Sequence, residues 1–456
     1  MGGERVGERQ EKEKENISDR KDEQKIYTRG KMKKGLKVLI SLSVVLLMVI
    51  GLILPLKSTQ CVLSDSNSSV VNIVSEDLDR WIRENESLYY KDISVKSTPI
   101  ESKIQPSSIS YIIFDVNVQQ MLKAQSPYEL PVIQGMMNCL NSKKQYLKQF
   151  QIDYANRKLG DQLKELREYI GRTEELNAVF KVEFYVDTKG NVDQNSIKFY
   201  TQTPDGDTFL NASILQPGTP EDLQRQGFKR MEKIIEESGQ NGLLSTTSSY
   251  YDAYDRITAG DYADTWTSNP PYDAWDDTHG YPPDPNDQYD PDSGAWWDTT
   301  HWNNEQYTLS RYFASDCADY VSQALHAGGI PMDTIYDTNH WWYDNSKPVS
   351  SYNSCPWVYV PALRNYMVSH GYLYPSTFDN ANKGCVAIEK YNNHVVMITQ
   401  NDTINRALSA HTTDRKHYWY SGSKINEDGT LGSYHSDYYE TNYDFYEVHY
   451  WVHLTS

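Results

Sequence analysis

A short helix that begins with a cysteine is the feature that most restricts what this chain can fold into. Residues 315–329 read SDCADYVSQALHAGG, in which Ser315 is a typical N-cap, apolar residues recur at helical spacing and two glycines end the helix. Cys317 lies in the first turn, where the positive end of the helix dipole favours a thiolate, the nucleophilic form of cysteine. Asp316 and Asp319 oppose this effect, so a neighbouring histidine is needed to hold the charge.

A histidine suited to that role precedes an apolar segment further along the chain. Residues 392–398 read NNHVVMI, which predicts a polar turn and then a strand that begins after His394. A cysteine at a helix start and a histidine at a strand edge form the pair that a cysteine hydrolase needs. We therefore expect Cys317 to be the nucleophile and His394 to take and return its proton. The alternative is a small buried cysteine and a histidine bonded only to the backbone.

The sequence offers three candidates for the group that orients the imidazole of His394. His411 lies in SAHT, at the end of the next predicted strand, whereas Asn401 and Asp402 lie in the intervening turn. An orienting group holds the tautomer and need not ionise, so each of the three would serve. His411 is the preferred candidate, and the other two are its rivals.

Several short motifs around these residues resemble, in the same order, the amidase domain found in bacterial surface proteins. The resemblance covers roughly residues 250–420. It rests on YDR at 254–256, GDYA at 260–263, DC at 316–317, VSQALHAGGIPM at 321–332, WWY at 341–343, His394, and SAHT at 409–412 followed by Asp414. The block around Cys317 is specific, and the other blocks gain weight from their order.

That family is similar to the papain-like cysteine amidohydrolases, beside the CHAP and NlpC-type cell-wall hydrolases. The resemblance implies an α+β fold with a nucleophile helix packed on an antiparallel sheet. It implies cleavage of an amide bond in bacterial cell-wall peptidoglycan or a peptide, with no cofactor and no metal. The chain departs from the family at two positions, because Asp319 replaces an expected asparagine and Cys385 an expected aspartate. The alternative is therefore a non-catalytic cell-wall-binding module with a degenerate hydrolase site.

An uncharged apolar segment, residues 38–56, predicts where the chain is located. Its length of about nineteen residues is enough to cross a bilayer. Basic residues precede the segment and acidic residues follow it, so residues 1–37 are expected in the cytoplasm and the rest outside. We expect a retained signal-anchor in the cell membrane, with a cleaved signal peptide as the alternative. The formal net charge of −18 belongs to the exported part and makes nucleic acid an unsuitable partner.

Composition divides the exported part into two predicted domains. Residues 57–76 are rich in serine and asparagine and read as a linker, and residues 240–249 form a second linker. Residues 77–239 are predicted to form a small α+β domain with a hairpin at 180–201. Residues 250–456 are the predicted papain-like amidase domain. We expect the first domain to be a stalk or dimerisation module, and a structural or signalling role centred on it is a further alternative.

The five cysteines show no spacing typical of metal ligands. Cys355 and Cys385 are the pair most suited to a disulfide, with isolated buried thiols as the alternative. The predicted fold is therefore α+β throughout. It consists of an N-terminal transmembrane helix, a smaller α+β domain and a papain-like C-terminal domain.

Overall fold

The computed structural model describes residues 65–204, 206, 208–240, 250–268, 287–290, 295–298, 302–303, 306–307, 316–344, 346, 354–391, 394–411, 414–423, 439 and 441–453. Residues 64–456 form one compact unit.

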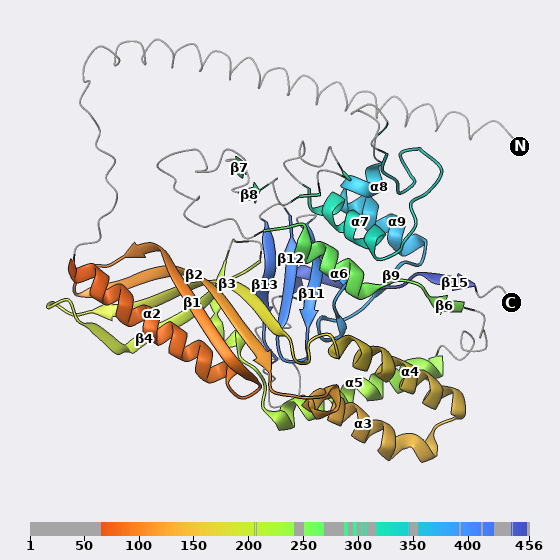
Figure 1. Cartoon of the computed structure of the whole chain (residues 1–456), viewed down its shortest axis with the longest axis horizontal. Coiled ribbons are helices and arrows are strands. Elements are labelled where there is room, and N and C mark those ends of the chain that lie inside the picture. The colour runs from red at the N-terminus through yellow and green to blue at the C-terminus, as the bar shows by residue number, and fades with distance from the viewer. Residues whose placement is uncertain are drawn as a thin grey trace, which may run out of the picture. The chain divides into compact units, whose positions relative to one another are not determined.

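One sheet of 11 strands runs through this unit (Figure 1). The strands follow the order β1-β2-β3-β13-β12-β11-β10-β14-β9, and β4 and β5 branch from β3. Neighbouring strands are antiparallel, except that β3 and β13 are parallel. The strands of this sheet are β1 (Tyr90–Lys103), β2 (Ser108–Leu122), β3 (Thr173–Val186), β4 (Val192–Gln202), β5 (Phe209–Asn211), β9 (Leu373–Pro375), β10 (Val386–Glu389), β11 (Val395–Asn401), β12 (Arg406–Ala410), β13 (Arg415–Ser421) and β14 (Tyr443–Val448).

The pairing of β3 with β13 overturns the predicted architecture. The prediction of a papain-like domain that follows a separate, smaller α+β domain is wrong, because one sheet takes strands from both regions. Asn177 on β3 lies opposite Tyr418 on β13, and the Asn177 amide donates a hydrogen bond to the carbonyl of Lys416 (3.0 Å). Without β3, the backbone groups along this edge of β13 would have no strand to pair with. The structure is a mixed α+β fold built on one large sheet.

In the part of the chain that the structure describes, no helix is both long and apolar enough to cross a membrane. The predicted membrane segment, residues 38–56, lies outside the described residues, as do residues 1–37 and 241–249.

The first linker ends earlier than the sequence predicted. Helix α2 (Asp65–Glu86) includes residues that were assigned to the linker. Val70, Val74, Leu78 and Ile82 recur every four residues along it and are all buried, which forms the apolar stripe of an amphipathic helix. Serine and asparagine lie between them, so composition alone concealed the periodicity.

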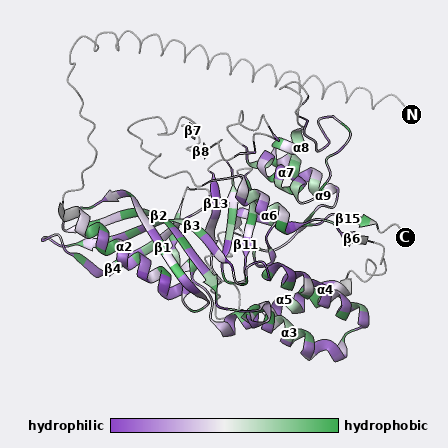
Figure 2. Ribbon diagram, in the orientation of Figure 1, coloured by the Kyte–Doolittle hydropathy of each residue, from purple (hydrophilic) through white to green (hydrophobic). Residues whose placement is uncertain are grey.

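Two groups of helices flank the sheet in addition to α2, which lies against β1 and β4. Helices α3, α4 and α5 pack on one another, and Figure 2 shows many hydrophilic residues along α4 and α5. Helices α6 and α7 pack on β11 and β12, with α8 and α9 beside α7 (Figure 1). The helices are α3 (Pro131–Lys143), α4 (Gln149–Leu166), α5 (Pro220–Gln240), α6 (Arg256–Thr265), α7 (Cys317–Ala327), α8 (Cys355–Val358) and α9 (Val360–Ser369), and two short ribbons pair β6 (Tyr250–Asp252) with β15 (Trp451–His453) and β7 (Asp287–Asp290) with β8 (Ala295–Asp298).

Strand β11 separates two hydrophobic cores. Val396 and Ile398 belong to a core that continues to β1, β2, β3 and α2. Val395 and Met397 belong to a second core, which includes Cys317 and the buried residues of α7 and α9. Both faces of β11 are therefore covered, which explains why its sequence is apolar without alternation.

Candidate active site

Cys317 is the first residue of α7, which confirms that it lies in the first turn of a helix, but the N-cap is Asp316 and not Ser315 as the sequence predicted. The helix begins there because the backbone N–H of Tyr320 donates to the carbonyl of Asp316 (2.9 Å), which is the first helical hydrogen bond. Cys317 is only 3% exposed and packs in the core beneath α7. The cysteine thus lies at a helix N-terminus in a nearly dry environment, where the helix dipole favours the thiolate and burial opposes it.

His411 lies next to Asp316 rather than in open solvent. Its Nδ1 is 2.9 Å from Oδ2 of Asp316, and its Nε2 is 2.6 Å from the carbonyl oxygen of Trp266. The imidazole stacks on the rings of Tyr320 (4.0 Å between centroids) and Trp302 (4.6 Å). These contacts fix the ring on both faces and at both nitrogens.

The hydrogen bonds of His411 also define its protonation. Burial lowers the pKa of His411 to about 3, so the imidazole is neutral at pH 7 and carries one N–H. The Trp266 carbonyl can only accept, so Nε2 carries that proton. The partner of Nδ1 must then donate. Asp316 can do so, because burial and the nearby Asp319 raise the pKa of its carboxyl well above the ordinary value.

His394 lies directly before β11, the strand against which α7 packs. The side chain is partly buried, and the His394 carbonyl accepts a hydrogen bond from the N–H of Glu389 (2.8 Å). Cys317 and His394 are therefore carried by adjoining elements. Val395 faces the core that contains Cys317, so strict alternation would direct His394 to the opposite face. A Cys317–His394 pair requires the chain to turn where β11 begins.

The three candidates for orienting His394 lie in different places. His411 uses both ring nitrogens on Asp316 and Trp266, so it holds the residue before Cys317. Asn401 ends β11, at the opposite end from His394, and its amide donates to the carbonyl of Ala381 (3.0 Å). Asp402 follows it. A strand rises about 3.3 Å per residue, which separates both rivals from His394 by roughly 20 Å.

Asp319, one of the two departures from the family pattern, is buried in the first turn of α7. Its carboxylate accepts a hydrogen bond from the indole N–H of Trp357. Burial raises the pKa of Asp319 to about 6, although this hydrogen bond opposes the rise. At neutral pH the carboxylate adds negative charge beside Cys317 and works against the thiolate.

Cys385, the second departure, is completely buried, and burial raises the pKa of its thiol to about 12. The preceding Gly384 has φ +78°, and a Cβ there would lie 2.4 Å from the carbonyl oxygen of Arg256, so this position requires glycine. Cys355 and Cys385, the pair considered for a disulfide, do not form one, which agrees with the alternative of isolated thiols. Both thiols are free, with Cys355 exposed on α8.

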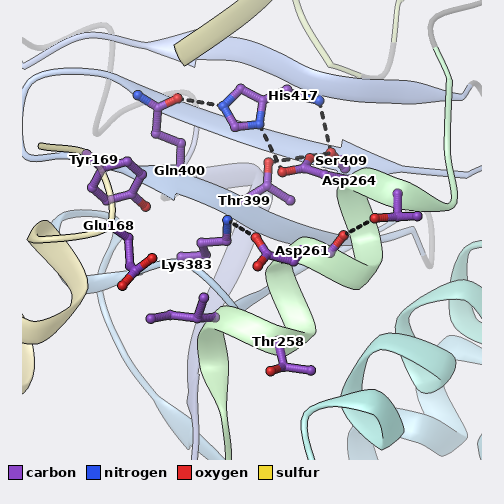
Figure 3. Close-up of polar contacts among 12 residues, drawn as sticks. Glu168, Tyr169, Thr258, Asp261, Asp264, Lys383, Thr399, Gln400, Ser409 and His417 are labelled. Carbon is purple, nitrogen blue, oxygen red and sulfur yellow. Dashed lines mark hydrogen bonds and ion pairs between the residues drawn. The ribbon is translucent and has the colours of Figure 1, made fainter. Parts of the chain in front are cut away.

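A polar cluster beside α6 contains His417, a residue that no sequence motif singled out. Figure 3 shows His417 between Gln400 on β11 and Asp264 on α6, with Ser409 of β12 against the same carboxylate. Lys383 pairs with Asp261 nearby (2.6 Å). The only local sequence signal is an aspartate that follows GDYA directly, so the sequence alone could not have joined these residues.

Comparison with known proteins identifies the segment that carries these residues. Residues 253–431 match a family model whose description is "Putative amidase domain". The match covers less than half of the 456 residues and includes Cys317, His394 and His411. No curated protein and no solved structure matches the chain. The chain therefore carries an amidase domain, as its motifs predicted, whereas the relationship to papain-like, CHAP and NlpC-type enzymes is not confirmed.

Proposed function

We propose that this domain is a cysteine-dependent amidohydrolase in which Cys317 is the nucleophile and His394 is the general base and acid. The observation that carries the proposal is the position of Cys317 at the start of a buried helix inside the amidase segment. Helix N-termini stabilise thiolates, and the raised pKa of Asp316 removes one of the two opposing charges at this end of α7, which leaves Asp319 as the other. Two local features then limit the rate of the proposed reaction: the negative charge of Asp319, and the turn that would bring His394 to Cys317.

The proposed reaction has two steps. The sulfur of Cys317 attacks the amide carbonyl carbon while His394 holds the thiol proton, and the backbone N–H of Cys317 is suited to the oxyanion. The C–N bond breaks as His394 protonates the leaving amine, which leaves a thioester. Water then attacks the thioester, and His394 takes one water proton and returns it to the departing sulfur. The products are a carboxylic acid, an amine and the original enzyme, with no cofactor.

The proposed substrate is an amide bond of bacterial cell-wall peptidoglycan, at a peptide or muramoyl-peptide position. This proposal rests on the family resemblance and on the uncharged segment at residues 38–56, which would hold the chain in the cell membrane with the amidase domain outside. An acidic exported surface is compatible with a wall substrate and unsuited to nucleic acid.

The second candidate function is a wall-binding module without catalysis. Asp319 favours it, because a buried carboxylate in the same helical turn weakens the thiolate at neutral pH. In that case the aromatic side chains near α7 would contribute to ligand binding while Cys317 stays unreactive.

The test uses the full chain as wild type, Cys317→Ala and Cys355→Ala, each incubated with purified peptidoglycan. Released fragments are identified by mass, and new amino groups are counted. We expect products from the wild type and from Cys355→Ala, whose exposed thiol is the matched control, and none from Cys317→Ala. Equal products from all three would exclude a Cys317 nucleophile. No products from any of them, with the chain sedimenting with the wall, would favour the binding module.

A further inference from the structure

We propose that His417 is a positioning residue, which in its doubly protonated form fixes the last turn of α6 and, through it, the Cys317 end of α7. This inference rests on the proposed function in that it assigns a role toward Cys317. The contacts that support it do not include Cys317 or His394 themselves.

The hydrogen bonds of His417 require a proton on both ring nitrogens. Nδ1 lies 3.0 Å from Oδ2 of Asp264, and Nε2 lies 2.6 Å from Oε1 of Gln400. The orientation of the Gln400 amide is fixed, because its Nε2 donates to the carboxylate of Asp402 (3.0 Å). Carboxylate and amide oxygens only accept, so a neutral imidazole would leave a lone pair facing one of them.

The backbone is distorted to bring His417 to this position. Its φ is +49°, in the left-handed region that residues with a Cβ seldom adopt. The register between β12 and β13 shifts between Leu408 and Ala410, and the N–H of His417 donates to Oγ of Ser409 (2.9 Å) instead of a strand carbonyl. Bulges of this kind redirect a side chain, and such conformations persist where the surroundings hold them.

The carboxylate that His417 holds belongs to a turn with two further contacts to the site. Ser409 also donates to Asp264 (2.6 Å), so the carboxylate is held from two strands. The carbonyl of Ala263, one residue earlier, accepts from the hydroxyl of Tyr320 on α7 (2.7 Å). The carbonyl of Trp266, two residues later, accepts from His411, which in turn bonds Asp316 next to Cys317. Moving Asp264 therefore moves both acceptors that hold α7.

The charges around His417 favour its protonated form. Asp264 on α6 and Glu174 on β3 raise the pKa of His417, and together they outweigh burial and the charge of Lys383, which lower it. Asp261 pairs with Lys383 and reduces that opposing charge. Since the folded pKa lies above the ordinary value, the positioning contact is complete at lower pH and is lost as pH rises through the raised pKa.

The region before the amidase segment holds the far end of this chain of contacts. The hydroxyl of Tyr90 on β1 donates to Oδ2 of Asp402 (2.6 Å), the carboxylate that orients Gln400. Asn405, in the same turn, donates to Glu86 of α2 (2.6 Å). Residues outside the matched segment therefore contribute to positioning His417, and through it the start of α7.

The experiment labels cysteines in the full chain with iodoacetamide from about pH 6 to about pH 9 and maps the products by peptide mass. Cys355 is exposed, so its labelling corrects for differences in reagent reactivity between samples. Cys139 and Cys385 are buried, so their labelling reports unfolding. Wild type is compared with His417→Gln, and with His449→Gln as a matched control, because His449 forms a similar pair with Asp252 (2.5 Å) away from α6.

Release of the α6 turn exposes Cys317, so the Cys317-to-Cys355 labelling ratio should rise at least severalfold in His417→Gln. In the wild type the ratio should rise with pH, and His449→Gln should follow the wild type. With a hydrolysed substrate, kcat of the wild type should decline as the pH rises through the raised pKa of His417. In His417→Gln, kcat should be about tenfold lower with KM little changed, and it should not show this decline. A ratio and a pH profile that equal those of the wild type would overturn the positioning role.

The two proposals fail in different ways. If the wild type releases no product from any amide, the proposed function fails, whereas the labelling ratio still decides the role of His417. If His417→Gln unfolds and labels Cys139 and Cys385, the milder Tyr90→Phe decides instead. It should shift the ratio in the same direction, while Tyr89→Phe, which loses a comparable hydrogen bond to Gly218 (2.6 Å), should not. Equal ratios for these two variants would reject the proposal.

Discussion

Asn177 of β3 and Tyr418 of β13 are register partners, and this parallel pair joins the two halves of the chain into one sheet. The side chain of each residue also forms a hydrogen bond across the boundary between the two halves. The Asn177 amide donates to the carbonyl of Lys416, and the Tyr418 hydroxyl donates to the carbonyl of Gln202 (3.1 Å). The amidase segment is therefore completed by strands that lie outside it.

A fragment that begins at residue 240 should fail to fold. It would expose the edge of β13 and leave Tyr418 and Trp419 without the β3 residues of their shared core. We expect aggregation and no cooperative thermal transition, measured by light scattering and circular dichroism. A chain that begins at Asp65 retains every described strand and should melt cooperatively. A soluble, cooperative transition in the shorter fragment would contradict the single-sheet description.

Local patterns in the sequence predicted local structure well. The helix at Cys317, the strand after His394 and the hairpin within residues 180–201 all depend on neighbouring residues, and the structure has α7, β11 and the β3–β4 pair there. The pairing of Asn177 with Tyr418 joins residues far apart in the chain, and no periodicity reports it. The contact of His417 with Asp264 likewise joins distant residues and forms only once α6 packs on the sheet.

Gly227→Ala should destabilise the protein by roughly 1–3 kcal/mol or more. A Cβ at Gly227 on α5 would lie 1.9 Å from the carbonyl oxygen of Val132 on α3, and backbone cannot yield as a flexible side chain does. Gly160→Ala in α4 is the control, because its Cβ would meet nothing within 4 Å. That change should stabilise by about 0.5–1 kcal/mol through helix propensity. Denaturant unfolding measures both, and equal effects would contradict the close approach of α3 and α5.

Glu86→Gln should flatten the pH dependence of stability. Burial raises the pKa of Glu86 from 4.5 to about 8, against hydrogen bonds from Asn405 and Gln120. The folded state then holds a proton that the unfolded state releases between these values, so the free energy of unfolding falls as pH rises across that interval. The slope from this group is at most about 1.4 kcal/mol per pH unit.

The glutamine at position 86 carries no proton to release, so this slope should disappear, and the stability gain over the wild type should grow up to about pH 8 and stay constant above it. Chemical unfolding at a series of pH values measures the difference. Glu84→Gln, at an exposed position of the same helix, should leave the wild-type curve unchanged. Parallel curves for wild type and Glu86→Gln would show that Glu86 is ionised in the folded protein.

Asp319→Asn should both stabilise the protein and activate Cys317 at neutral pH. Burial raises the pKa of Asp319 from 3.8 to about 6, so its stabilising proton is lost as pH rises through that range. Asparagine keeps an acceptor for the indole of Trp357 and removes the charge. The free energy of unfolding at pH 7 should rise by roughly 1–3 kcal/mol and be unchanged below about pH 4.

Alkylation of Cys317 in this variant should begin at lower pH, since the opposing carboxylate is gone. Glu84→Gln, which removes an exposed carboxylate of α2, is the control and should change neither measurement. An alkylation profile of Cys317 that does not move in Asp319→Asn would mean that this carboxylate does not limit the thiolate.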